Sequence, residues 1–336
     1  MLRKISVLSC LLVTFVVVSA AQDARHFTFH YAFTVKNLSA GKKVRIWIPA
    51  AQSDAFQEVK VVSAGGDLPV RKTREAKYGN EVYYAESHSA TQPELHFDVE
   101  YDIVRRERIA LNPSAHPVNA SLTTKERVQD LQPDALVPIT GLPADLASNV
   151  TEGKTTPLDK ARALYDYVFM TMKYDKTGTG WGHGDVLYAC DAKKGNCTDF
   201  HSLFIAMARS QGIPARFEIG FPLPPDKHSA EIAGYHCWSD FYVDGKGWVP
   251  VDISEAWKHP EKRDYFFGSH DVNRVQFSMG RDLRLNPPQE GKPLNYFVYP
   301  YVEVDGKEYS NVSLAFSFAD VEAAVAFQVT RPSTGQ

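Results

Sequence analysis

The sequence lacks the features that mark several large classes of protein. It contains no long run of basic residues and its net charge is −3, so no nucleic-acid partner is expected. No internal repeat, low-complexity tract or EF-hand calcium loop occurs in it. Beyond the N-terminus, no stretch is apolar for long enough to span a bilayer. What is present is a chain of 336 residues, 44% of them hydrophobic, which is enough for two domains or for one elaborated domain.

Cysteine is scarce, with four residues in the whole chain. Apart from Cys10 near the N-terminus they are Cys190, Cys197 and Cys237, and this odd number leaves at least one free thiol unless two chains are joined. If Cys197 is the free thiol, Cys190 and Cys237 are a candidate disulfide pair; the alternative is three reduced thiols. The histidines and cysteines of residues 183–236 do not form the short pairs typical of zinc sites, so no metal and no cofactor is expected.

The N-terminus has the pattern of a secretory signal peptide over residues 1–21. Two basic residues precede an apolar run, 5–18, which is too short to span a bilayer comfortably, and small residues for cleavage follow up to Ala21. The alternatives are an uncleaved anchor or a lipid on Cys10, although little apolar sequence precedes that cysteine. We therefore expect an exported protein, periplasmic or extracellular, with no transmembrane segment once the signal is removed.

Residues 22–106 show the two-residue alternation of half-buried strands. The candidate strands with this alternation, or with a similar pattern, are 27–35, 44–48, 80–84 and 95–103. Gly, Pro and Asn clusters separate them, so we predict an N-terminal antiparallel β-sandwich domain. Residues 107–154 have weak periodicity and several prolines, which is typical of a connector with short helices.

Residues 155–275 are predicted to form a central α+β domain. Thr156 and Pro157 provide a hydroxyl cap and a first-turn proline for one helix. A glycine- and aromatic-rich segment, 176–189, is either a cleft-lining loop or an ordinary surface loop. A second helix is predicted over about 197–211, with Cys197 one turn before the apolar stripe that begins at Phe200, so that its side chain points inward.

A β-hairpin is predicted from strands 234–242 and 248–253 around the turn Asp244-Gly245. Folding about residue 244 puts His236 opposite Asp252 on one face of the hairpin, with Cβ atoms about 4.5–5.5 Å apart. A slip by one residue would move one of them to the other face. Residues 276–336 are expected to supply C-terminal strands that complete or flank this central domain.

Cys197, His236 and Asp252 have the residue types of a nucleophile, its base and the group that orients the base. A free thiol has a pKa near ~8.5, and both a helix N-terminus and a protonated imidazole would lower it. The alternatives are a cysteine that merely packs, a structural histidine and an aspartate that caps a strand end.

The oxyanion of an acyl-transfer intermediate would need hydrogen-bond donors beside the thiol. The backbone N–H of Cys197 is one candidate. Trp181 and Tyr188 are candidates for the second donor, and the candidates for the wall of the cleft are Trp181, Tyr235, Trp238 and Trp248. Core packing is the alternative role for these aromatic side chains.

Four motifs, in this order, resemble the core of the transglutaminase-like superfamily, and they span roughly residues 155–256. They are Gly195–Phe200, the segment ARSQGIPAR at 208–216, His236-Cys237-Trp238, and GWVPVD at 247–252. The resemblance implies a papain-like α+β fold with the cysteine on a helix and an antiparallel sheet that carries the histidine and aspartate. It also implies that Cys197, His236 and Asp252 are catalytic. The flanking β regions resemble those of bacterial secreted proteins with this core.

The function that follows is acyl transfer on peptide or protein amide bonds through a thioester on the cysteine. Water would release an acid, as in a peptidase or amidase, and an amine would give transamidation, as in a protein-glutamine transamidase. We expect hydrolysis because water is always available and no amine site is evident. A non-catalytic envelope protein that binds or scaffolds through its β-sandwich is the alternative of a different class.

Overall fold

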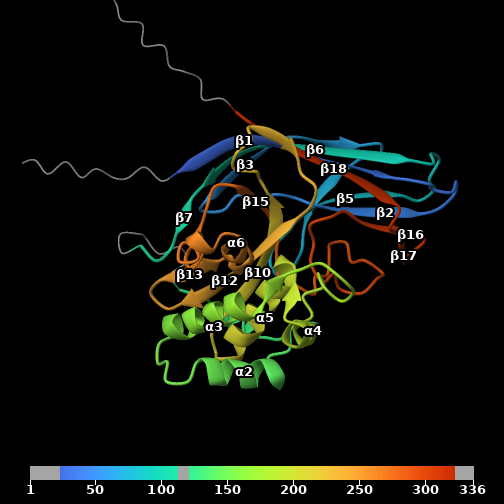
Figure 1. Cartoon of the computed structure of the whole chain (residues 1–336). Helices are drawn as coiled ribbons and strands as arrows, with labels where there is room; N and C mark the ends of the chain where they lie inside the picture. Colours follow the sequence, from blue (N-terminus) through green and yellow to red (C-terminus); the bar gives the residue numbers. More distant parts are fainter. Residues whose placement is uncertain (1–22, 113–120, 322–336) are drawn as a thin grey trace, which may run out of the picture.

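The computed structural model describes residues 23–112 and 121–321 (Figure 1). Two five-stranded antiparallel sheets occupy one end of the molecule, and a smaller sheet with most of the helices occupies the other. The predicted α+β class is confirmed, and so is the β-rich character of the N-terminal region. The predicted signal peptide, 1–21, lies outside the described residues. Within the described ranges, no helix is long and apolar enough to cross a bilayer.

The first large sheet has the strand order β11-β18-β1-β6-β3. Its strands are β1 (Ala24–Val35), β3 (Gln57–Gly66), β6 (Leu95–Arg106), β11 (Ser229–Glu231) and β18 (Val312–Asp320). In β1, every second side chain from Phe27 to Val35 is buried, as the sequence predicted. The buried positions of β6 alternate in the same way, and they lie opposite those of β1 along the whole pair. One face of this sheet therefore packs on the core while the other meets solvent.

The second large sheet has the order β17-β16-β2-β5-β4. Its strands are β2 (Val44–Pro49), β4 (Arg71–Arg74), β5 (Glu81–Ser87), β16 (Tyr301–Val304) and β17 (Lys307–Glu308). All six residues of β2 are buried, because this strand lies in the middle of the sheet and is covered on both faces. The inward side chains of the two large sheets belong to one continuous hydrophobic core. The predicted β-sandwich limits, 22–106, stay a prediction, but its sheets also draw on strands much later in the chain.

The C-terminal strands do not join the central domain as a group, which corrects that expectation. Among the C-terminal strands up to residue 321, β15 (Arg274–Met279) pairs with a strand of the central sheet, whereas β16 and β18 pair with β2 and β1. The reason is that aromatic residues of β18 pack against the inner face of β1. The ring centroids of Tyr31 and Phe316 lie 4.7 Å apart, and those of Phe27 and Phe318 lie 6.4 Å apart.

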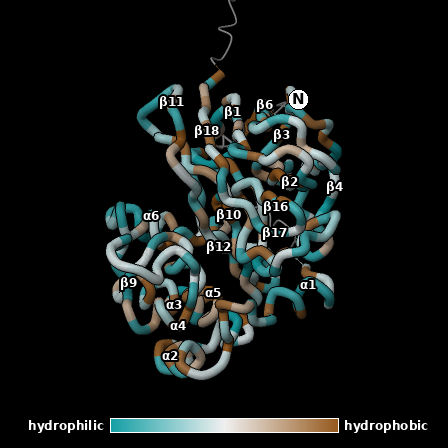
Figure 2. The backbone as a smooth tube through the Cα atoms, turned by 90° about the vertical axis from the view of Figure 1, so that its right-hand side faces the viewer, coloured by the Kyte–Doolittle hydropathy of each residue, from teal (hydrophilic) through white to brown (hydrophobic). Residues whose placement is uncertain are grey.

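The central sheet has the order β13-β12-β10-β15. Its other strands are β10 (Ala215–Pro222), β12 (His236–Val243) and β13 (Gly247–Val251). The helices are α1 (Thr124–Gln129), α2 (Leu142–Val150), α3 (Pro157–Thr171), α4 (Val186–Ala192), α5 (Cys197–Ser210), α6 (Ile253–Lys258) and the 3-10 turn η1 (Pro260–Lys262). Short pairs join β7 (Arg108–Ile109) with β14 (Ser269–His270) and β8 (Lys173–Tyr174) with β9 (Lys194–Gly195). Figure 2 shows β11 extending from the central domain up to β18, so the two parts are interlocked.

Helix α5 is more deeply buried than its amphipathic pattern predicts. Every residue from Cys197 to Arg209 is buried, not only the predicted apolar stripe. The cause is that α5 is surrounded, since β10 and β12 lie on one side and α2, α3, α4 and α6 contact the others. Its polar side chains are therefore paired inside the protein: Arg209 Nη1 lies 2.7 Å from Asp134 Oδ2, and Ser202 accepts a hydrogen bond from Arg281.

The hairpin β12–β13 forms as predicted, but in a register two residues away from the predicted one. Val243 lies opposite Gly247 and Ser239 lies opposite Val251, because the turn is centred on Gly245, one residue after the expected centre. His236 and Asp252 are therefore not direct cross-strand neighbours, and Asp252 lies just past the end of β13. A shift by two preserves the side-chain alternation, so both residues still point to the same face of the hairpin.

Candidate active site

Cys197 is the first residue of α5, and the residues around it explain why the helix begins there. The Asn196 side chain accepts a hydrogen bond from Thr198 N at 2.9 Å, and the Asp199 side chain accepts one from Asn196 N at 2.9 Å. This reciprocal capping box satisfies two backbone donors that a helix start leaves free. Gly195 has φ of +156°, and a Cβ at this position would collide with the Asp199 side chain. The sequence Gly-Asn-Cys thus fixes where the thiol leaves the backbone.

Asp199 also fastens the glycine-rich loop to the start of α5. Its two carboxylate oxygens accept hydrogen bonds from Gly182 N at 2.7 Å and from Gly184 N at 2.9 Å. Both glycines have positive φ, +85° and +61°, a conformation that other residues rarely adopt. Part of the predicted loop 176–189 is helical, because α4 begins at Val186 with Asp185 as its cap. The loop is therefore an ordered neighbour of Cys197.

The structure brings Cys197, His236 and Asp252 together. His236 Nε2 lies 2.7 Å from Asp252 Oδ2, and the side chains of His236 and Cys197 interact directly. Since Nε2 is bonded to Asp252, Nδ1 is the ring nitrogen left for the thiol. Asp252 is also the N-cap of α6, where it accepts a hydrogen bond from Glu255 N at 3.1 Å. The exposed fractions are 2% for Cys197, 4% for His236 and 0% for Asp252, so all three lie out of bulk water.

The charges of this group stabilise one another. Burial raises the pKa of Cys197, but hydrogen bonds from Cys237 and His236 and the charge of His236 outweigh it and hold that pKa well below its usual value. Burial also opposes a charged imidazole, yet the Asp252 carboxylate and the bonded thiol raise the pKa of His236 to about 10. The ring in turn keeps the pKa of Asp252 well below its usual value, against the effect of burial. A thiolate–imidazolium pair is the protonation state that these directions favour at neutral pH.

Two neighbours of the group were not predicted from the sequence, His201 and Arg274. His201 Nε2 accepts a hydrogen bond from Ile253 N at 3.0 Å, and burial lowers its pKa to about 4, so this ring is neutral. Its position one helical turn after Cys197 was a usable signal. Arg274 Nη1, from β15, donates to Asp252 Oδ2 at 2.9 Å. No local pattern links that arginine with Asp252, because they meet only when β15 joins the sheet.

Removing the Arg274 charge should destabilise the fold. Arg274→Met takes away one of the two cationic partners of the buried Asp252 carboxylate, so we expect about 3 kcal/mol less stability in urea unfolding at neutral pH. Arg74→Gln is the matched control, since Arg74 is 65% exposed and lies 2.9 Å from Glu81. Loss of this surface pair should cost less than about 1 kcal/mol. Equal losses in the two variants would contradict a special role for the buried pair.

The aromatic candidates for the oxyanion site are arranged differently from the expectation. Trp238 Nε1 donates to Glu218 Oε2 at 2.7 Å, and Trp181 Nε1 donates to the Gly178 carbonyl at 3.2 Å, so both indole N–H groups are used away from the thiol. The Tyr188 hydroxyl is buried without a hydrogen-bond partner among the described residues. Trp238 does pack beside His236, with ring centroids 5.8 Å apart.

Tyr235, one of the candidates for the cleft wall, lies beside the start of α5. Its hydroxyl lies 2.9 Å from Thr198 Oγ1 and accepts from Asn196 Nδ2 at 2.9 Å. Both partners flank Cys197 in the sequence, so this ring is held against the start of α5. The ring centroids of Tyr235 and Tyr296 are 5.5 Å apart, and those of Tyr235 and Tyr299 are 5.9 Å apart. Three tyrosines therefore form a wall next to the thiol.

The candidate disulfide between Cys190 and Cys237 is wrong. Cys190, Cys197 and Cys237 are all free and buried. Cys190 belongs to α4, whereas Cys237 lies in β12 beside Cys197, so the fold places Cys237 next to a different cysteine from the one expected.

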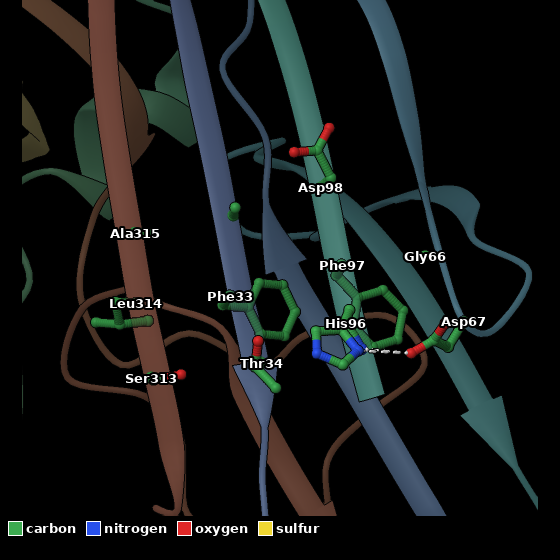
Figure 3. A pocket seen from close by; sticks show the side chains of 11 residues that line it. Phe33, Thr34, Gly66, Asp67, His96, Phe97, Asp98, Ser313, Leu314 and Ala315 are labelled. Atoms are coloured by element: carbon green, nitrogen blue, oxygen red, sulfur yellow. Dashed lines mark hydrogen bonds and ion pairs between the residues drawn. The ribbon is translucent and has the colours of Figure 1, made fainter. Parts of the chain in front are cut away.

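A separate hollow of about 320 Å³ lies on the outer face of the first large sheet (Figure 3). It is bounded by β1, β6, β18 and the end of β3, and small side chains such as Ala32 and Ala315 leave it open. Figure 3 shows His96 turned toward Asp67, with Nδ1 3.1 Å from a carboxylate oxygen. None of Cys197, His236 and Asp252 lines it, so it is distinct from the buried group described above.

Residues 144–253 match the family model of the transglutaminase-like superfamily. The chain has a transglutaminase-like core. The match spans α2 to the start of α6, which includes α5 and the β12–β13 hairpin, and it agrees with the family predicted from the four sequence motifs.

The similarity to other proteins extends beyond residues 144–253. An uncharacterized protein of Haemophilus influenzae is 29% identical over 318 residues, which cover 83% of this chain and 85% of that protein. The uncharacterized protein YebA of Bacillus subtilis is 26% identical over 129 residues, 34% of this chain and 18% of that longer protein. The crystal structure of a "Putative Cysteine Protease" from Cytophaga hutchinsonii has a TM-score of 0.58 at 15% identity, and it covers 90% of this chain and 92% of that one. The fold of this chain is thus shared with that structure over most of its length.

Proposed function

We propose that this protein is a cysteine-nucleophile enzyme that transfers acyl groups from peptide or protein amide bonds, and that water is the usual acceptor. One arrangement carries the proposal: His236 lies between a thiol at a helix start and the Asp252 carboxylate, 2.7 Å from the latter. A nucleophile, a base and a group that orients the base are the parts that acyl transfer needs.

In the first half of the reaction, the Cys197 thiolate attacks the amide carbonyl. The helix start supports the thiolate, and the backbone N–H of Cys197 is available to the oxyanion that forms. The imidazolium of His236 then gives its proton to the leaving amine, so the C–N bond breaks and a thioester remains on Cys197. Asp252 keeps the ring oriented and stabilises its charged form throughout.

In the second half, the neutral His236 ring takes a proton from the acceptor, which attacks the thioester. Water gives an acid, and an amine gives a new amide. Hydrolysis is the proposal because water needs no binding site of its own. The thiol is buried, and the wall formed by Tyr235, Tyr296 and Tyr299 restricts the access of water to the thioester. This restriction would favour transamidation over hydrolysis if an amine bound there.

Trapping the acyl-enzyme tests this function directly. The full chain is mixed with the p-nitrophenyl ester of an N-acyl amino acid and quenched in acid within seconds, and its mass is measured before and after digestion. We expect one acyl group on the peptide that contains Cys197, and free acid as the final product. With an added primary amine at millimolar concentration, the ratio of amide to acid reports the choice between transamidation and hydrolysis.

Cys190→Ala is the matched control for this experiment, because Cys190 is also buried but lies in α4 away from His236. It should acquire the same adduct at the same rate. If the wild-type protein carries the acyl group on a lysine or on Cys190, or carries none, the proposal is wrong. A binding or scaffolding protein would then be favoured.

A further inference from the structure

We infer that Cys237 is a resolving thiol for Cys197, so that a peroxide converts the two residues into a reversible disulfide. The inference begins from an unexpected neighbour. Cys237 directly follows His236 in β12, and its sulfur lies 3.6 Å from Oγ1 of Thr198, the residue that follows Cys197 at the start of α5. Both thiols are free and buried, with exposed fractions of 2% for Cys197 and 0% for Cys237.

The surroundings of Cys237 hold its sulfur at the start of α5. Its S–H donates to Thr198 Oγ1 at 3.6 Å, and Thr198 is the residue next to Cys197. His201 Nδ1 lies 3.8 Å from the same sulfur. Since His201 Nε2 accepts from the Ile253 N–H, the neutral ring carries its proton on Nδ1 and directs it at Cys237. Partners on two turns of α5 therefore fix the second thiol beside the first.

The two elements that carry these thiols are already packed, since α5 lies directly against β12. A disulfide between them would join two elements that are already in contact. Cys190 has no such relation to Cys197, because it belongs to α4 and burial raises its pKa to about 11. Cys190 is thus an internal reference for oxidation, because it belongs to the same chain and meets the same peroxide.

The chemistry balances with a hydroperoxide as the oxidant. The Cys197 thiolate attacks one peroxide oxygen, the S–O bond forms, the O–O bond breaks, and the leaving hydroxide takes the proton of the His236 imidazolium to become water. Sulfur is oxidised to the sulfenic acid and the peroxide is reduced. The Cys237 thiol then attacks this sulfur, its proton leaves with the hydroxyl group as a second water, and the disulfide closes.

Two consequences follow for the proposed enzyme. The disulfide removes the nucleophile, so oxidised protein cannot form a thioester. It also consumes the sulfenic acid before a second peroxide can oxidise it to sulfinic acid, a product that thiol reductants do not reduce. Exposure to peroxide would therefore switch the site off without destroying it.

The test is a mass measurement on the whole protein treated with micromolar hydrogen peroxide. We expect a loss of about 2 Da, a cross-linked peptide pair containing residues 197 and 237 in a non-reducing digest, and full reversal by dithiothreitol. Cys190→Ser should behave in the same way. Cys237→Ala should show no such loss, and its Cys197 should gain about 32 Da as sulfinic acid that dithiothreitol does not remove.

The inference is overturned if Cys197 of the wild type gains oxygen while Cys237 stays open to alkylation, or if the disulfide contains Cys190. The wild-type digest reads the outcome without any variant, so poor folding of Cys237→Ala would not obscure it. The readout also needs no substrate. Failure of the acyl-enzyme experiment and failure of this one are therefore separate results.

Discussion

Replacing Cys197 with alanine should reduce turnover of an amide or ester substrate by about a thousandfold or more, to the level of background hydrolysis. Without the sulfur no thioester forms, and the remaining backbone donors and His236 only assist attack by water. The substitution removes one buried sulfur from the first turn of α5, where alanine is well tolerated and Asn196 still caps the helix. The measurement is kcat/KM for a p-nitrophenyl ester together with a urea unfolding curve.

Cys190→Ala controls for the loss of a buried sulfur elsewhere in the same domain. It should keep wild-type kcat/KM, because Cys190 lies in α4 and takes no part in the His236–Asp252 group. Activity that persists in Cys197→Ala at more than a few per cent would rule out the thioester route. A fall in both variants would point to a general effect of packing.

Cys197 should also be alkylated by iodoacetamide at pH 6 about a thousandfold faster than Cys190. The thiolate is the reactive form. The pKa of Cys197 lies well below its usual value, so its thiolate is present at pH 6, whereas burial raises the pKa of Cys190 to about 11, which leaves it protonated. A thiolate of low pKa is less nucleophilic, which reduces but does not cancel the difference in population. Timed quenching and peptide mapping give the two rates.

His236→Ala separates the effect of the imidazolium from that of the helix start. It removes the charge and a hydrogen bond that lower the pKa of Cys197, so alkylation at pH 6 should slow markedly and recover as the pH is raised toward 9. His259→Ala is the matched control, since His259 is exposed and lies beyond α6. If Cys197 reacts no faster than Cys190 in the wild type, the thiolate–imidazolium pair is wrong.

The position of the thiol was predictable because the signals are local. Gly195, Asn196 and Asp199 lie within one turn of Cys197, and the capping hydrogen bonds join side chains and backbone N–H groups of that turn alone. The alternation in β1 and β6 was predictable for the same reason, since a two-residue period reports which side chains share a face. The family followed from four motifs that are each short.

The hairpin shows where local signals stop. Alternation requires His236 and Asp252 to share a face, and they do, but it cannot distinguish registers that differ by two residues. The turn and the start of α6 decided that choice, by moving Asp252 off the strand and into a helix cap. The two side chains still meet at 2.7 Å because β12 begins at His236 and β13 ends at Val251, so both residues lie at the end of the hairpin away from its turn.

The sequence by itself determined the fold class, the family, and the short segments that carry Cys197, His236 and Asp252. Only the tertiary structure decided that β16 and β18 join the N-terminal sheets, that Arg274 pairs with Asp252, and that Cys237 rather than Cys190 lies beside Cys197. The physical reason is the separation along the chain of the residues that interact. Caps and periodicity are fixed by residues a few positions apart, whereas these contacts arise when apolar faces from distant segments are buried together.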